Sequence, residues 1–158
     1  MMNKIIRTTL ITLLLTFAAH AAAQQGLQIA TVFQKYGKQK GVTMVELSNE
    51  MLETYQMTLY KSLVFKDASD ALPTILRCLE ADKKKAKKVK EVVSNGQIKS
   101  GYYQLPQLKE DVNRFILFKT GKKDSATLIY IEGELDADDL FTIFNQGCQC
   151  SIVMNRQS

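Results

Sequence analysis

The sequence contains no tryptophan and a single histidine, His20. His20 lies inside an N-terminal stretch, residues 1–23, that has the three-part pattern of a secretory signal peptide. A chain that loses this stretch has no histidine, which excludes Ser-His-Asp and Cys-His catalysis and nearly every zinc or copper site. The missing tryptophan removes one common sugar-stacking side chain, although tyrosine can substitute for it.

A long hydrophobic run is also missing. Lys4 and Arg7 precede an apolar stretch from about residue 10 to residue 19, and small residues follow as far as Ala23. The apolar stretch is shorter than the roughly 20 residues that a membrane-spanning helix needs. We therefore expect a cleavable signal peptide at 1–23, a soluble protein in the periplasm or outside the cell, and no integral membrane segment after cleavage. No cysteine lies near the cleavage site, which argues against a lipid anchor.

The length and the charge limit the remaining chain. Residues 24–146 are long enough for one domain, followed by a C-terminal tail over 147–158. Loss of Lys4 and Arg7 lowers the formal net charge from +5 to +3. A mildly basic exported domain does not indicate nucleic-acid binding, so we expect no nucleic-acid partner.

Cysteine is scarce as well, with only Cys78, Cys148 and Cys150. An oxidising compartment permits disulfides, but three cysteines cannot all pair within one chain. Two interpretations stay open: one bridge from Cys78 to Cys148 or Cys150, or buried free thiols. A redox or soft-metal site at Cys148 and Cys150 is the weaker alternative, because their spacing is not C-x-x-C and no histidine assists them.

The first half of the chain predicts two helices around one strand. Residues 27–36 form a short helix that ends at Gly37, and the alternating stretch 41–48 is typical of a strand. Ser48 is expected to cap a long amphipathic helix over 49–65. Its apolar residues recur at spacings that suit a helix: Leu52, Tyr55, Leu59 and Leu63.

The second half predicts further strands and helices. A loop at 70–73 leads to a short buried strand over 74–79. Asp82 then caps a helix over 83–94, and Asn95-Gly96 ends it. Three strands and a closing helix follow, over 98–105, 114–120, 126–135 and 137–145, with a hairpin turn between the last two strands.

This order predicts an α+β fold. We expect a two-layer sandwich in which helices cover one face of a mixed, mostly antiparallel sheet of about five strands. A ferredoxin-like arrangement of part of the chain is an open alternative.

A lysine-rich segment, DKKKAKKVKE, starts at Asp82. On a helix, Lys84, Lys87 and Lys88 would share the face opposite an apolar stripe, which predicts a solvated helix face. The functional alternative is a patch that binds an anionic glycan or lipid, assisted by Tyr102, Tyr103 and Tyr130. Lysines in the first turn of such a helix would oppose the helix dipole.

Five carboxylates lie within IEGELDADDL: Glu132, Glu134, Asp136, Asp138 and Asp139. Alternation along a strand would place Glu132 and Glu134 on a solvent-facing side. Asp136 occupies an N-cap position, and the two aspartates after it suit the first turn of a helix. Local structure thus accounts for all five residues, and we expect neither a metal site nor a paired-carboxylate hydrolase.

Three segments resemble a family of small exported Bacteroidota proteins, domain of unknown function 4252. They are FQKYGKQKGVTMVELSNEML, ILRCLEADKKKAKKVKE and ATLIYIEGELDADDL, and the resemblance spans about residues 27–145. These motifs are structural, and the resemblance implies no activity, cofactor or site residue. It implies secretion or lipid anchoring, of which the sequence supports only secretion.

The favoured hypothesis is an exported, non-catalytic interaction domain without a cofactor, whose partner is a protein or another component of the cell envelope. The alternatives are a binder of an anionic glycan or lipid through Lys84, Lys87 and Lys88, and a redox or metal protein built on the C-terminal cysteines.

Overall fold

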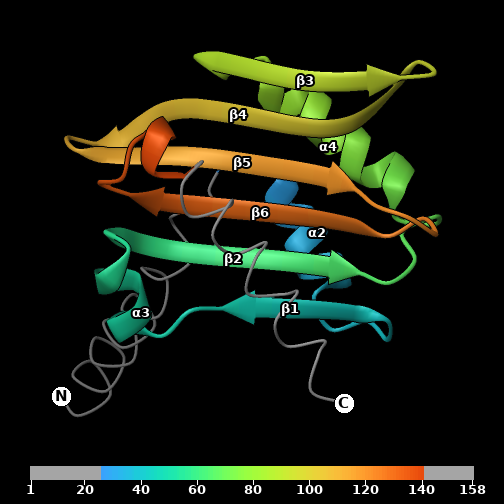
Figure 1. Ribbon diagram of the computed structural model, residues 1–158, viewed down its shortest axis with the longest axis horizontal. Helices are drawn as coiled ribbons and strands as arrows, with labels where there is room; N and C mark the ends of the chain where they lie inside the picture. Colours follow the sequence, from blue (N-terminus) through green and yellow to red (C-terminus); the bar gives the residue numbers. More distant parts are fainter. Residues whose placement is uncertain (1–25, 141–158) are drawn as a thin grey trace, which may run out of the picture.

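Six strands form one antiparallel sheet in the computed structural model, which describes residues 26–140 (Figure 1). The strands lie in the order β1-β2-β6-β5-β4-β3. Their bounds are β1 Val42–Glu46, β2 Met57–Phe65, β3 Lys88–Ser94, β4 Gln97–Lys109, β5 Val112–Thr120 and β6 Ala126–Gly133. The helices are α2 Ile29–Tyr36, α3 Asn49–Thr54 and α4 Leu72–Lys83, and residues 137–140 begin another helical turn.

The α+β class is confirmed, and the details of the sheet differ from the prediction. The sheet has six strands where about five were expected, and every pair of neighbouring strands is antiparallel. Strands β3 to β6 follow one another as a meander, and β6 then pairs with β2 in the middle of the sheet. This order does not confirm a ferredoxin-like arrangement.

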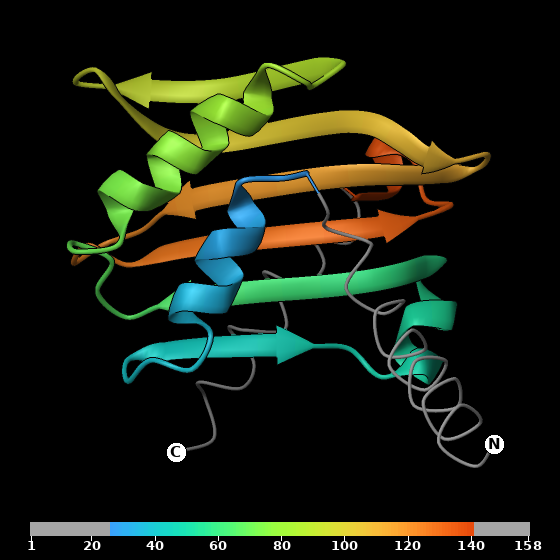
Figure 2. The ribbon, with the colours of Figure 1, turned by 180° about the vertical axis from the view of Figure 1, so that it is seen from behind.

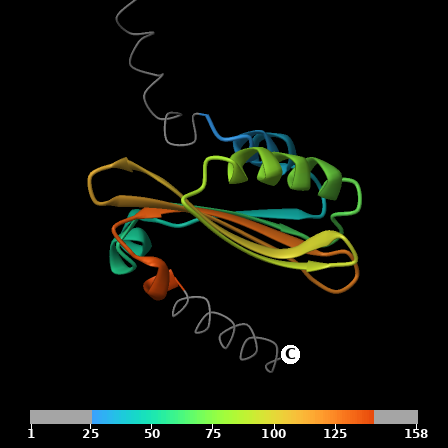
Figure 3. The ribbon, with the colours of Figure 1, turned by 90° about the horizontal axis from the view of Figure 1, so that it is seen from above.

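Helices lie on both faces of the sheet, where one face was expected. Helices α2 and α4 lie side by side over one face (Figure 2). Helix α3 and the turn at 137–140 lie on the opposite face, near one end of the strands (Figure 3). Each face therefore carries its own apolar cluster. The larger cluster includes Phe33, Ile75 and Tyr103, and the smaller one includes Leu52, Phe115 and Leu140.

Helix α4 corrects the prediction of a strand over 74–79. Its buried side chains recur at spacings of three and four, as one face of a helix requires: Ile75, Cys78, Leu79 and Asp82. Pro73 lies in the first turn, where its missing N–H costs no hydrogen bond. The six-residue apolar stretch was too short to distinguish a buried strand from one side of a helix.

Strand β2 corrects the prediction of a long helix over 49–65. Ser48 does precede a helix, but α3 ends at Thr54, and Gln56 adopts a positive φ of 54° that redirects the chain. Residues 57–65 then pair with β1 and β6. Ser48 occupies the N-cap position without donating or accepting a side-chain cap hydrogen bond.

Strand β3 corrects the prediction of a helix over 83–94. The dipeptide Asn95-Gly96 does not end a helix; it connects β3 to β4 in a hairpin. Both residues have positive φ, 53° and 72°, as a type I′ turn requires. The predictions of a helix ending at Gly37, of β1, and of the hairpin between β5 and β6 are confirmed. The predicted signal peptide and C-terminal tail lie outside the described residues.

Candidate functional site

Strand β3 forms one edge of the sheet and pairs only with β4 within residues 26–140. Six of its seven residues are exposed, and Glu91 is half-buried. Val92 and Val93 are 60% and 56% exposed, the highest values among the exposed large hydrophobic side chains of the described chain. An edge strand also presents unpaired backbone N–H and C=O groups along its outer side. The β3 edge, residues 88–94, thus combines exposed apolar side chains with an outer side that no strand of residues 26–140 pairs with.

The lysines gather at the start of this edge. Helix α4 ends at Lys83, Lys84 occupies its C-cap position, and Lys88 is the first residue of β3. Lys84, Lys87 and Lys88 are exposed, and no ion pair of their side chains is found among residues 26–140. We call these three residues the lysine corner. The prediction that they share a helix face is wrong, because the connection from α4 to β3 brings them together.

The helix dipole favours the first lysines of the run. Lys83 in the last turn of α4 and Lys84 at its C-cap lie near the partial negative charge of the last carbonyl groups, whereas the predicted helix would have placed them at an N-terminus. Part of the lysine run is therefore explained by helix termination. Lys85 donates a hydrogen bond to the carbonyl oxygen of Gly26, which connects the corner to the segment before α2.

A polar cluster fixes β3 to α4. Lys83 Nζ lies 2.7 Å from Glu91 Oε2 and 3.4 Å from Glu80 Oε1, and Tyr103 Oη donates to Glu91 Oε1 at 2.7 Å. Burial acts to raise the pKa of Glu91, but the hydrogen bonds from Lys83 and Tyr103 outweigh it and lower that pKa. Gly101 makes room for Tyr103, because a Cβ there would lie 2.6 Å from Tyr103 Cε2. These contacts hold the edge strand in place.

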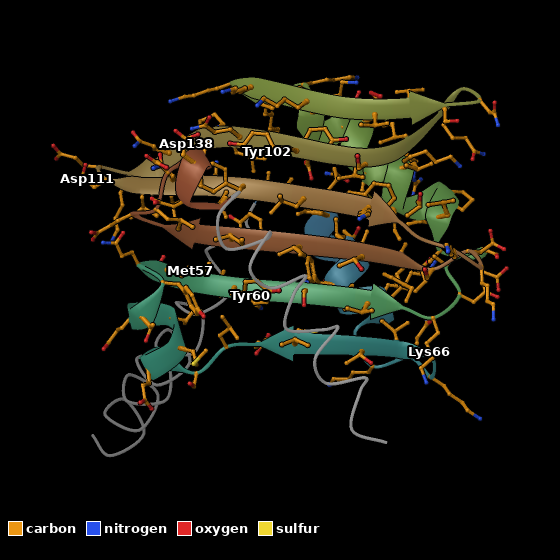
Figure 4. All side chains as sticks on the ribbon, in the orientation of Figure 1. Met57, Tyr60, Lys66, Tyr102, Asp111 and Asp138 are labelled. Carbon is orange, nitrogen blue, oxygen red and sulfur yellow. The ribbon has the colours of Figure 1, made fainter. Side chains whose placement is uncertain are left out.

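The three tyrosines are not exposed on this surface, although the hydroxyl of Tyr103 donates to Glu91. Tyr102, Tyr103 and Tyr130 are 6%, 1% and 0% exposed. Figure 4 places Tyr102, together with Tyr60, on the face of the sheet opposite α2 and α4. Burial, followed by the hydrogen bond from its hydroxyl to Glu132, raises the pKa of Tyr130. An anionic ligand at the lysine corner would therefore meet lysines and β3 without these rings.

The carboxylate-rich segment is largely structural. Asp136 Oδ1 accepts hydrogen bonds from the N–H groups of Asp138 and Asp139 at 2.8 and 3.0 Å, so the predicted N-cap is confirmed. Asp139 Oδ2 in turn accepts from the Asp136 N–H at 3.0 Å. The prediction for Glu132 is wrong: its side chain is 4% exposed and accepts from Tyr130 Oη at 2.6 Å.

Glu132 lies on the face that α2 and α4 cover, because it follows Tyr130 by two residues along β6 and therefore shares its face, and Tyr130 packs in the same cluster as Phe33 and Ile75. Arg114 is its cross-strand neighbour on β5, and Lys61 faces Tyr130 on β2. Burial raises the pKa of Glu132, and the hydrogen bond from Tyr130 and the nearby charges of Arg114 and Lys61 only partly oppose this. No short-range pattern predicts this burial, because alternation alone does not show that both faces of the strand are covered.

Cys78 is buried on α4 with its Sγ 3.7 Å from Thr31 Oγ1, and residues 26–140 contain no other cysteine that could pair with it. Cys148 and Cys150 lie outside the described residues, so the pairing of the three cysteines stays a prediction. No group of three potential metal ligands occurs among residues 26–140. No helix in the same part of the chain is long and apolar enough to cross a membrane.

The sequence matches the profile of a family of unknown function, DUF6108, over residues 16–144. The chain belongs to this family. The expectation of an uncharacterised domain is confirmed, whereas the resemblance to domain of unknown function 4252 is not. The family match supplies no activity and no site residue.

Two further comparisons add little. No curated protein matches the sequence. A crystal structure of a Pseudomonas aeruginosa protein of unknown function is similar at 14% sequence identity and a TM-score of 0.34, covering 72% of this chain and 81% of that one. A similarity this low carries no functional argument.

Proposed function

We propose that this protein is an exported, non-catalytic interaction domain and that the β3 edge is its contact surface. One observation carries the proposal: within residues 26–140, β3 has a neighbouring strand on one side only and leaves Val92 and Val93 exposed. Proteins commonly protect such edges with charges, bulges or covering elements, because an open edge pairs with other chains. The valine end of β3 has little of this protection, although the register shifts between Val92 and Val93.

The rest of the molecule supports a binding role. Local structure accounts for the acidic segment after β6, and the polar cluster of Lys83, Glu91 and Tyr103 serves to hold β3 in place. The N-terminal sequence pattern supports export. The absence of histidine from residues 24–158 narrows the catalytic chemistry that this chain can perform.

Comparative capture from the envelope fraction of the producing cell tests this proposal. The bait is the purified protein, and the test variant is V92K/V93K, which keeps strand geometry and changes only exposed side chains. The matched control is V45K, which changes a valine that is 38% exposed on the opposite edge strand, β1. We expect wild type and V45K to capture the same partner in similar amounts. V92K/V93K should capture at least about tenfold less of it. Equal capture by all three proteins would contradict the proposal.

The lysine corner favours a second candidate, the binding of an anionic glycan or lipid. Lys84, Lys87 and Lys88 bring three exposed cationic side chains to one corner of the sheet. Binding of this kind depends strongly on salt, since the Debye length falls from about 30 Å at 0.01 M to about 8 Å at 0.15 M salt. Sedimentation with vesicles that contain anionic lipid, at low and physiological salt, tests it. Loss of binding in K84E/K87E/K88E would support this candidate, and no binding at low salt would eliminate it.

A further inference from the structure

We infer that the β3 edge accepts an extended polypeptide segment as an added, antiparallel strand, and that this segment is apolar in its first half and acidic in its second half. The inference rests on the proposed function and specifies the chemistry of the partner at the same surface.

The backbone geometry favours a polypeptide. In an antiparallel edge strand, alternate residues direct their N–H and C=O groups away from the sheet. Another extended chain satisfies these groups in register, as in the known cases of strand addition to a sheet edge. A glycan or a lipid headgroup has no matching row of donors and acceptors. Within residues 26–140 no strand occupies the outer side of β3.

The edge is held in place before a partner arrives. Lys83 on α4 and Tyr103 on β4 both bind the carboxylate of Glu91 in the middle of β3. The Asn95-Gly96 turn fixes the far end of the hairpin through its two positive φ angles. A partner strand would then lose its own conformational entropy on binding without also having to order β3.

The side chains along β3 set the direction of the partner. The lysine corner lies at the start of the strand, and Val92 and Val93 lie toward its end. The two glutamates near the corner, Glu80 and Glu91, contact Lys83, and within residues 26–140 neither forms an ion pair with Lys84, Lys87 or Lys88. An antiparallel partner begins beside the valines and ends beside the lysines. Cross-strand pairing therefore favours apolar residues first and acidic residues last.

A second copy of this chain suits the edge less well. Antiparallel pairing of two β3 strands would place each lysine corner beside the valine end of the other copy. Such a pairing brings cations to apolar side chains and supplies no carboxylate partner for them. Self-association is therefore an outcome that the test must detect and not the expected result.

Two labelled peptides of identical composition and opposite order test the inference. The forward peptide, VTVTVETEE, has its acidic residues last, and the reversed peptide, EETEVTVTV, has them first. Fluorescence anisotropy with the purified protein gives each affinity at about 50 and about 300 mM salt. Hydrogen exchange of the β3 amides with and without peptide reports on strand pairing. Sedimentation with vesicles that contain phosphatidylglycerol detects binding to an anionic lipid. Light scattering of the protein alone detects self-association.

We expect the forward peptide to bind at least about fivefold more tightly than the reversed one and to slow exchange in β3. Both K84E/K87E/K88E and V92K/V93K should weaken binding at least about tenfold. The control K38E/K40E/K66E reverses three exposed lysines elsewhere, so it changes the net charge equally and should stay within about twofold of wild type.

Equal binding of the two peptides, or no binding of either, would overturn the inference. So would binding that leaves β3 exchange unchanged, binding to vesicles but not to peptide, or a dimer that V92K/V93K abolishes. The proposed function is tested separately by the capture experiment. If capture of an envelope partner still depends on Val92 and Val93, the β3 edge remains the contact surface and only strand addition is wrong.

Discussion

Asp82 caps a helix that begins 53 residues before it in the sequence: its Oδ2 accepts a hydrogen bond from the Ile29 N–H at 2.9 Å. Its Oδ1 accepts from the Gln28 N–H at 2.8 Å. Helix α2 has no side-chain cap of its own, so a buried carboxylate near the end of α4 satisfies its first N–H groups. This contact joins the two helices that cover one face of the sheet.

Replacing Asp82 with alanine should destabilise the protein by about 2 kcal/mol, because two N–H groups near a helix N-terminus lose their acceptor. Urea unfolding at neutral pH measures the free energy. The matched control is D70A, which removes an exposed carboxylate and should change stability by less than about 0.5 kcal/mol. An equal effect of both substitutions would show that the long-range cap does not matter.

Replacing Gly101 with alanine should lower the free energy of unfolding by about 1–3 kcal/mol, which is the usual penalty for overpacking. The added Cβ would collide with the ring of Tyr103 and move its hydroxyl away from Glu91. The loss should be smaller in a Y103L background, where the obstructing ring is absent. A double-mutant cycle by urea unfolding measures this coupling, and strictly additive effects would contradict the explanation.

The variant E132Q should gain stability relative to wild type as the pH rises from about 4 to 7. Burial raises the pKa of the Glu132 carboxyl, so the folded protein binds its proton more tightly than the unfolded chain does. The stabilisation by that proton is complete below the ordinary pKa of the carboxyl and is lost as the pH rises through the raised value. Glutamine has no proton to lose and can still accept from Tyr130. Unfolding free energies across this range test the sign, and a relative loss with rising pH would show that the Tyr130 hydrogen bond and the charges of Arg114 and Lys61 outweigh burial.

The opposite sign is expected at Glu91. Its pKa is lowered in the folded protein, so its contribution is present above the ordinary pKa and is lost as the pH falls through the lowered value. E91Q should therefore have a free energy of unfolding about 1–2 kcal/mol below that of wild type at pH 7, and this difference should shrink toward pH 3. A deficit that does not change with pH would mean that the charge of Glu91 is unimportant.

The elements that could be predicted from the sequence carry local signals. Gly37 ended α2 as expected, alternation identified β1, and the aspartate at 136 marked the start of a helix. The hairpin between β5 and β6 followed from two β-rich stretches around a polar turn. In each case the short-range pattern agrees with the tertiary structure.

The predictions of secondary structure failed where one sequence pattern fits both a helix and a strand. The spacing from Leu52 to Leu63 suits a helix, but residues 57–65 also alternate, and their pairing with β6 decides the outcome. Lysine favours helices, and this concealed β3. Asn95-Gly96 follows the valines of residues 89–93 and precedes Ile98 and two tyrosines, which is a strong hairpin signal that could have revealed the strand. The burial of Asp82 and Glu132 depends on contacts with distant elements, and no short-range pattern reports those.

Site-specific photo-crosslinking in the producing cell tests the central claim most directly. A photoreactive amino acid at position 92 lies on the β3 edge, and one at position 45 lies on the opposite edge strand at an exposed valine. We predict a discrete crosslinked partner from position 92 that is absent from position 45. Crosslinks from position 45 alone, or the same products from both positions, would contradict the assignment of the β3 edge as the contact surface.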